Sequence, residues 1–115
     1  MHEVGIANAV IDAARQEAER RPGSRLMRVG VRIGELAAVD PEALRFCFDA
    51  LTRGTDLEQL VLEIQPSPRR HRCEPCRREF QVVAYEFACP ECGRQDTLFV
   101  SGDELELAYV ELEEA

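Results

Sequence analysis

Two pairs of cysteines constrain this chain more than any other feature. Each pair has the form C-x-x-C: Cys73 and Cys76 enclose Glu-Pro, and Cys89 and Cys92 follow after twelve intervening residues. One such turn directs two sulfurs at an ion, and a second turn completes the tetrahedron that Zn²⁺ accepts. Two structural disulfides or a redox pair are the alternative interpretations. Because a Cys₄ set leaves no open coordination position, the pattern predicts a structural zinc and says little about function.

The overall composition narrows the class of protein. A chain of 115 residues forms one small domain or two very small ones, and its formal charge of −8 argues against general nucleic-acid binding. The N-terminal sequence MHEVGIANAV lacks a basic region and a long apolar run, and no stretch approaches the roughly 20 apolar residues of a membrane span. We therefore expect no secretory signal, no membrane segment and a reducing cytoplasmic setting, in which thiols remain available for metal.

Hydrophobic periodicity predicts the secondary structure. Apolar residues three and four positions apart indicate amphipathic helices, and alternation from Leu26 to Leu36 indicates a half-buried strand. Asp40 followed by Pro41 is typical of a helix N-cap and first turn. Cys47 falls on the apolar stripe of that second helix and is interpreted as a core thiol. The expected elements are helices at 2–20 and 41–54, and strands at 26–36, 60–66 and from 105 onward.

This order predicts an α/β fold of two helices on a three-stranded mixed sheet, with an inserted Cys₄ zinc-ribbon module. The first strand, helix and second strand form a parallel pair with a right-handed crossover, and the last strand returns antiparallel. The expected domains are 1–66 plus 102–115, and a zinc-binding module at 67–101. Apolar residues between the two CxxC turns predict the hairpin of that module: Phe80, Val82, Val83, Tyr85 and Phe87.

The N-terminus offers a second candidate metal site. The α-amino group of Met1, the backbone nitrogen of His2 and its imidazole can chelate one ion, and Glu3 adds a backbone nitrogen or its carboxylate. Such nitrogen and oxygen donors suit Ni²⁺ or Cu²⁺ better than Zn²⁺. A frayed helix start is the plainer interpretation. The predicted topology brings the start of the first helix near Asp40, which makes this N-cap residue a candidate neighbour of the metal.

Several short motifs together resemble the HypA/HybF family. They occur in the family's order along nearly the whole chain: MHE, V-x-I-G-E-L from Val31 to Leu36, P-E-A-L-x-F from Pro41 to Phe46, Gly54-Thr55, C-P-E-C-G and G-D-E-L. The resemblance implies a nickel metallochaperone for [NiFe]-hydrogenase maturation, and in some organisms for urease. It implies nickel as transferred cargo at Met1, His2 and Glu3 in the 1–66 plus 102–115 domain. It also implies structural zinc at Cys73, Cys76, Cys89 and Cys92.

The resemblance also implies partners, namely a HypB-type nickel GTPase and the hydrogenase large subunit, and it leaves a homodimer open. Some relatives carry a histidine inside the zinc module that can approach nickel. Here only His71 lies nearby, just outside the first CxxC. A histidine contribution from the module is therefore not predicted.

Arginines near the first CxxC support a rival hypothesis. They are Arg69, Arg70, Arg72, Arg77 and Arg78. They could contact RNA phosphates, which would make the chain a zinc-ribbon nucleic-acid or adaptor module. We favour charge balance around a zinc–thiolate centre, because the module lacks a series of aromatic side chains for base stacking. No P-loop, nucleophile–base pair or HExxH motif is present, so the chain is interpreted as a carrier and not an enzyme.

Overall fold

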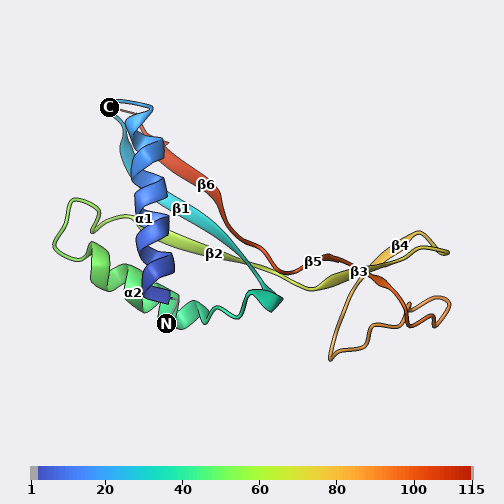
Figure 1. Ribbon diagram of the computed structural model, residues 1–115. Helices are drawn as coiled ribbons and strands as arrows, with labels where there is room; N and C mark the ends of the chain where they lie inside the picture. Colours follow the sequence, from blue (N-terminus) through green and yellow to red (C-terminus); the bar gives the residue numbers. More distant parts are fainter. Residues whose placement is uncertain (1–2, 115) are drawn as a thin grey trace. The chain divides into compact units, whose positions relative to one another are not determined.

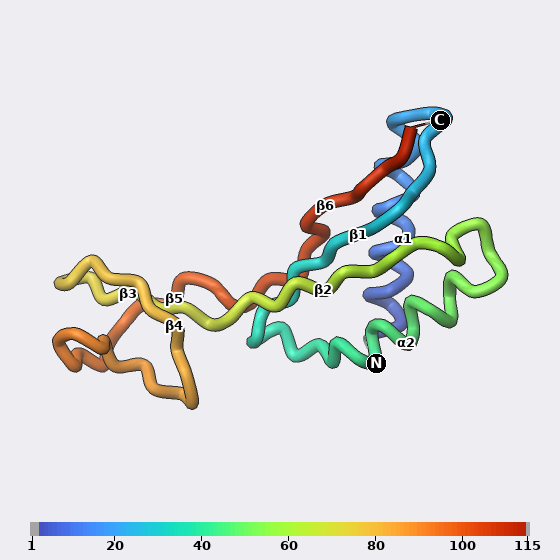
Figure 2. Tube along the Cα trace, turned by 180° about the vertical axis from the view of Figure 1, so that it is seen from behind, coloured from blue at the N-terminus to red at the C-terminus, as the bar shows by residue number. Residues whose placement is uncertain are grey.

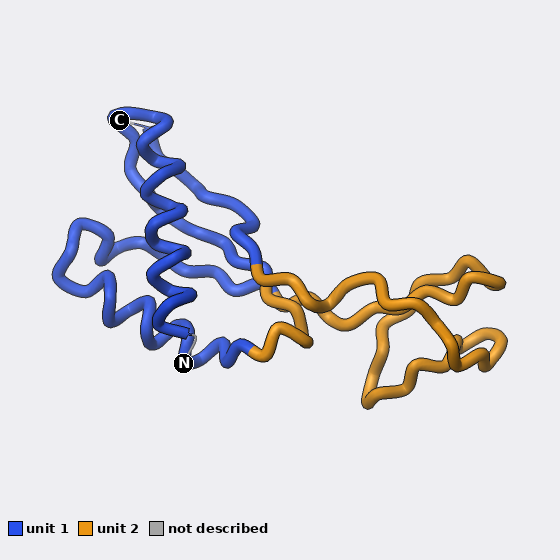
Figure 3. Tube along the Cα trace, viewed as in Figure 1, with its two compact units in different colours: residues 1–32, 39–65, 106–115 blue, residues 33–38, 66–105 orange. Residues whose placement is uncertain are grey.

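The computed structural model describes residues 3–114 and divides the chain into two compact units (Figures 1 and 3). Unit 1 comprises residues 1–32, 39–65 and 106–115, and unit 2 comprises residues 33–38 and 66–105. Compared with the domain boundaries expected from the sequence, residues 33–38, 66 and 102–105 belong to the second unit. None of the helices among the described residues is long and apolar enough to cross a membrane.

Two helices on a three-stranded mixed sheet form the α/β layer that the sequence predicts. The strand order is β2–β1–β6, and Figures 1 and 2 show both helices on one face of this sheet. The elements are α1 (Glu3–Glu19), β1 (Arg25–Gly34), a 3₁₀ turn η1 (Glu35–Ala37), α2 (Pro41–Thr52), β2 (Val61–Ser67) and β6 (Leu105–Glu113). The predicted fold class is therefore confirmed, with element ends that shift by a few residues.

Alternating and helical patterns account for the core of unit 1. Val29 and Val31 of β1 are buried, as are Ala7 of α1 and Leu44 and Phe48 of α2. Val29 and Val31 lie on the same face of the sheet, because successive residues of a strand point to opposite faces. The buried helix residues cover that face. Burial of apolar side chains stabilises each by about 1.5–3 kcal/mol relative to exposure. Cys47 is only half-buried, so the expectation of a core thiol is met in part.

The last strand leaves part of its apolar surface exposed. Leu105 and Leu107 are exposed, and Tyr109 extends across β1 to Glu63 of β2. A Cβ atom added at Gly30 would lie 2.0 Å from Cε1 of Tyr109, so the ring covers this glycine.

Unit 2 contains a second sheet with the order β4–β3–β5. Its strands are β3 (Arg70–Cys73), β4 (Arg78–Gln81) and β5 (Leu98–Ser101), and both pairings are antiparallel. The predicted hairpin between the two CxxC turns is wrong in its pairing, because β4 pairs with β3, which precedes the first turn. Within residues 82–88 the described pairing is a single bridge between Val83 and Glu86. Val83 and Tyr85 are exposed at this turn, whereas Phe80 and Val82 are buried.

Backbone contacts explain why residues 33–38 join unit 2. The Leu36 amide donates to the Gly102 carbonyl at 2.7 Å, and the Arg69 amide donates to the Glu35 carboxylate at 3.2 Å. Gly102 has φ +123°, and a Cβ atom there would lie 2.6 Å from the Cα of Arg69. Only glycine fits this conformation and this close approach.

Candidate metal centre

Two similar turns present the four cysteines. Cys73 ends β3, and the amide of Arg77 donates to the carbonyl of Glu74, which closes the first turn. In the second turn the amide of Gly93 donates to the carbonyl of Cys89 at 2.9 Å. The residue after each CxxC has positive φ, 54° at Arg77 and 78° at Gly93. Glycine signals this conformation in the sequence at position 93, but no sequence signal marks it at Arg77.

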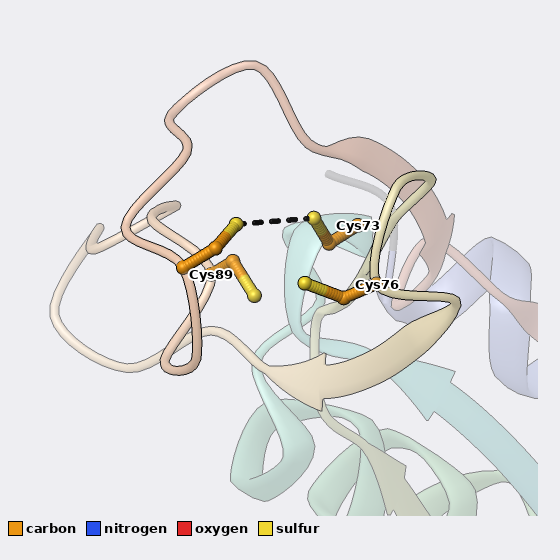
Figure 4. A group of neighbouring side chains, drawn as sticks. Cys73, Cys76 and Cys89 are labelled. Carbon is orange, nitrogen blue, oxygen red and sulfur yellow. Dashed lines mark hydrogen bonds between the residues drawn. The ribbon is translucent and has the colours of Figure 1, made fainter.

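The four sulfurs converge on one point (Figure 4). The candidate ligand atoms of Cys73, Cys76, Cys89 and Cys92 all lie within 4.8 Å of one another, and the sulfurs of Cys73 and Cys92 are 3.7 Å apart. Zn–S bonds of about 2.3 Å in a tetrahedron place sulfurs about 3.8 Å apart. A disulfide requires about 2.05 Å, and all five cysteines are free. The donor set therefore fits a tetrahedral thiolate site better than two disulfides.

Backbone amides prepare the cluster for negative charge. The amide of Glu91 donates to the sulfur of Cys89 at 3.4 Å. The pKa of Cys89 is lowered to about 7, chiefly by the amide of Cys92. Hydrogen bonds shared with Cys92 and Cys73 raise the pKa of Cys76 to about 12. One thiolate therefore forms readily while its neighbours resist further charge, and a dication is needed to hold four thiolates together.

The pKa of Cys73 is shifted by opposing causes. Its hydrogen bond with the amide of Cys76 lowers the pKa, but burial and hydrogen bonds with Cys92 and Cys89 outweigh it, so the net shift is upward. Cys73 and Cys89 are buried, Cys76 is half-buried and Cys92 is exposed. A competing ligand can therefore reach the site from the side of Cys92. The two buried sulfurs lie behind it.

Three of the five arginines near the first CxxC are paired with carboxylates. The pairs are Arg70–Glu79, Arg72–Glu74 and Arg78–Glu91, at 3.8, 3.1 and 3.4 Å. Carboxylates neutralise these three arginines, whereas Arg69 donates to Nε2 of His71. The nucleic-acid hypothesis needs a basic patch without such carboxylate partners, so these pairs weaken that hypothesis.

His71 is buried, with both ring nitrogens occupied. The hydroxyl of Thr97 donates to the carbonyl of Phe87 at 2.7 Å, so its oxygen must accept from Nδ1 of His71 at 3.0 Å. Nε2 of His71 then accepts from Nε of Arg69 at 3.0 Å. Burial, followed by the charge of Arg69, lowers the pKa of His71 and keeps the ring neutral. This histidine is therefore not poised to bind a metal.

The N-terminal candidate site is described only in part. Met1 and His2 lie outside the described residues. Glu3 is the first residue of α1, and its carboxylate accepts a hydrogen bond from the amide of Asp40 at 3.0 Å. Asp40 is the N-cap of α2, with Oδ1 accepting from the amides of Glu42 and Ala43. The predicted N-cap is confirmed, and the structure brings Glu3 beside Asp40.

Comparison with known proteins gives consistent matches. A family profile described as "Hydrogenase/urease nickel incorporation, metallochaperone, hypA" matches residues 1–112. The hydrogenase maturation factor HypA of Chlorobium luteolum is 39% identical over 114 residues, covering 99% of this chain and 97% of that protein. The HypA of Geotalea daltonii is 43% identical over 105 residues, covering 91% and 93%.

Two solution structures share the fold. The nickel metallochaperone HypA of Helicobacter pylori has a TM-score of 0.66 at 22% identity, with full coverage of both chains. A second HypA structure has a TM-score of 0.68 at 23% identity, covering all of this chain and 97% of the other. These two likenesses concern the fold alone.

An α/β unit together with a unit of four converging cysteines defines a small protein with a candidate thiolate metal site. The matches to the family profile and to relatives over nearly the whole chain identify it further. The chain belongs to the HypA family of nickel metallochaperones, which serve hydrogenase maturation.

Proposed function

We propose that this chain binds Ni(II) as cargo through Met1, His2 and Glu3 and releases it for hydrogenase maturation. Membership of the family over residues 1–112 supports nickel as the metal. The 3.0 Å hydrogen bond from the Asp40 amide to the Glu3 carboxylate supports the location of the site. This bond holds the start of α1 against the N-cap of α2. The donors of the N-terminus and the Asp40 carboxylate can therefore converge on one ion, with Asp40 as a neighbour of the nickel.

Transfer by ligand exchange follows from this location. Fused chelate rings formed by the amine, the backbone nitrogen and the imidazole hold Ni²⁺ through several donors. A ligand set at a chain terminus leaves one edge of the coordination sphere accessible. A recipient's ligands can then replace the donors one at a time, so the protein acts as a carrier and not as a catalyst.

The four-cysteine cluster is assigned a structural Zn(II) in the same proposal. Its support is the sulfur spacing and the closed thiolate set, because tetrahedral S₄ coordination favours zinc over nickel. In this proposal the nickel cargo is bound by the domain of residues 1–66 and 102–115, and the zinc is bound by residues 67–101. Four free thiols suit a reducing cytoplasm, which is part of the proposal.

The partners in this proposal are a HypB-type nickel GTPase as the source or co-carrier and the hydrogenase large subunit as recipient. Urease is a second client class, since the family description covers both enzymes. The matched relatives that carry the name hydrogenase maturation factor support hydrogenase as the first client to test. Direct binding of each purified partner to the nickel-loaded chain is the corresponding measurement.

Nickel titration of the untagged protein tests the proposal. We expect wild type to bind nickel with tight, near-stoichiometric saturation by calorimetry. His2→Ala, or an N-terminal tag that blocks the amine, should abolish this binding while elemental analysis still finds one zinc per chain. Unchanged nickel affinity in both altered proteins would overturn the N-terminal site. Absence of zinc from the wild type would overturn the zinc assignment separately.

A further inference from the structure

A cluster of one buried and three partly buried residues lies beside the four cysteines without contributing a ligand. We define the His71 cluster as His71, Arg69, Phe87 and Thr97. The imidazole stacks on the ring of Phe87 with centroids 5.4 Å apart and planes 10° apart, and the Arg69 guanidinium lies 4.6 Å from the same centroid. His71 is 5% exposed, and its two ring nitrogens bond to Thr97 and Arg69.

The cluster connects the two halves of the metal site through the chain. His71 lies on β3, two residues before Cys73. Phe87 lies two residues before Cys89, and Thr97 follows the second turn. The Thr97 hydroxyl donates to the Phe87 carbonyl, which closes the base of the loop that carries Cys89 and Cys92. The His71–Thr97 bond then attaches this closed loop to the strand that carries the first CxxC.

We propose that His71 and Thr97 are positioning residues that hold the second CxxC loop at the first and thereby set how fast the metal leaves the four cysteines. This inference rests on the proposed zinc site. Separation of the loop from β3 breaks the His71–Thr97 hydrogen bond and withdraws Phe87 from the imidazole. Buried polar groups that lose their partners are costly, so the cluster opposes the opening that metal release requires.

The burial of the sulfurs agrees with this role. Cys92 is exposed and Cys76 is half-buried, so a competing chelator replaces these ligands first. Cys73 and Cys89 are buried next to Phe80 and Val82. Complete release therefore requires the loop that bears Cys89 to move away from β3. That motion is the one that the His71 cluster restrains.

Thr97→Val and Thr97→Ser form the matched pair that tests the inference. Valine has the shape of threonine but lacks the hydroxyl that accepts from His71 and donates to Phe87, whereas serine retains it. We expect zinc release from Thr97→Val into excess chromogenic chelator to be about tenfold faster than from wild type, because a tenfold change matches the loss of about one hydrogen bond. Thr97→Ser should release zinc at nearly the wild-type rate.

His71→Phe supplies an independent variant. Phenylalanine retains stacking on Phe87 but loses both ring-nitrogen bonds, so we expect faster release here as well. Co(II) in place of zinc gives a spectroscopic measure, since weaker positioning should reduce the intensity of the tetrahedral ligand-field bands in Thr97→Val and His71→Phe but not in Thr97→Ser. If Thr97→Val holds no metal while Thr97→Ser retains it, the inference is also supported, because the valine variant then releases metal too fast to be isolated with it.

Three outcomes would overturn the inference. They are equal release rates in wild type and Thr97→Val, equal acceleration in Thr97→Val and Thr97→Ser, and metal loss in both variants. Wild type that holds no zinc would instead refute the proposed zinc site. Nickel titration of Thr97→Val keeps the two questions separate, because binding at the N-terminus should remain as in wild type.

Discussion

At the scale of single residues, Tyr109 joins the two outer strands of the sheet in unit 1. Its ring lies over Gly30 of the central strand, and its hydroxyl donates to the Glu63 carboxylate on β2. This hydrogen bond, with a smaller contribution from Gln65, lowers the pKa of Glu63 below its ordinary value of 4.5. A carboxyl with a lowered pKa in the folded state adds stability above its unfolded pKa and loses it as the pH falls through the folded pKa.

Tyr109→Phe should reduce stability at neutral pH and flatten its dependence on acid. Without the hydroxyl, the pKa of Glu63 returns toward 4.5, so the stability gap between variant and wild type should be constant above about pH 5.5 and narrow below about pH 4.5. Urea unfolding followed by circular dichroism from pH 7 to pH 3.5 measures this gap. Tyr85→Phe is the matched control, since Tyr85 is 83% exposed. A gap that persists unchanged at pH 3.5 would contradict the assignment.

Gly30 and Gly5 should respond oppositely to alanine. At Gly30 the new Cβ would lie 2.0 Å from the Tyr109 ring, so Gly30→Ala should cost about 1–3 kcal/mol through overpacking. Nothing lies within 4 Å of a Cβ at Gly5 in α1, so Gly5→Ala should add roughly 0.5–1 kcal/mol through helix propensity. Thermal unfolding of both variants checks the signs. Adding Tyr109→Ala should relieve most of the Gly30→Ala penalty.

At the scale of elements, the start of α2 combines a structural and a proposed functional role. Asp40 accepts two backbone amides of the first turn, and its own amide donates to the Glu3 carboxylate. Pro41 at the first turn completes a favourable start. One short segment thus stabilises α2 and holds the first residue of α1, so substitutions here need controls that separate stability from nickel binding.

Asp40→Asn and Asp40→Ala provide that separation. Asparagine is as good an N-cap as aspartate, whereas alanine should cost about 1 kcal/mol of unfolding free energy. If the carboxylate lies near the nickel, both variants should bind nickel more weakly, although only Asp40→Ala is destabilised. Denaturant unfolding and nickel calorimetry on the same preparations measure the two effects. Wild-type nickel affinity in Asp40→Asn would remove Asp40 from the proposed site.

Charge pairs also specify the pairing of β1 with β6. Arg28 pairs with Glu111 at 3.2 Å, and Arg32 pairs with Glu106. Such exposed pairs add little stability individually. Their arrangement nevertheless places opposite charges on neighbouring strands, which favours the pairing of β1 with β6.

At the scale of the whole molecule, the two units are stabilised in different ways. Unit 1 buries a core of aliphatic and aromatic side chains from both helices and the sheet. In unit 2 the core cluster consists of Cys73, Phe80, Val82 and Cys89, so two of its four buried residues are candidate metal ligands. We therefore expect a core this small to need a bound metal for stability, as in other small metal-binding domains.

Metal removal should therefore loosen unit 2 and leave unit 1 folded. After treatment with chelator, we expect amides of β3 and β4 to lose protection from hydrogen exchange while amides of α1 and β1 retain it. Cys73→Ser should reproduce this pattern. Cys47→Ser, which alters the half-buried cysteine of α2, should not. Simultaneous loss of protection in α1 would show that the two units do not fold independently.

Local features of the sequence determined the helices, the strands of unit 1 and the four cysteines of the candidate metal site. Periodicity, an Asp-Pro helix start and the CxxC spacing each act within a few residues, and each led to the observed element or cluster. The exception among local predictions was the hairpin between the CxxC turns. Apolar residues at 80–87 indicate a strand without revealing its partner, and β4 pairs with β3 instead.

Tertiary structure alone decided the contacts between residues distant in the sequence. His71 and Thr97 are 26 positions apart, and Glu63 and Tyr109 are 46 apart. No local pattern selects such partners, because their approach depends on how strands and loops pack after they form. The sequence thus specifies which atoms can bind a metal. The fold specifies which side chains hold those atoms in place, because a hydrogen bond between distant residues exists only after the chain has closed around it.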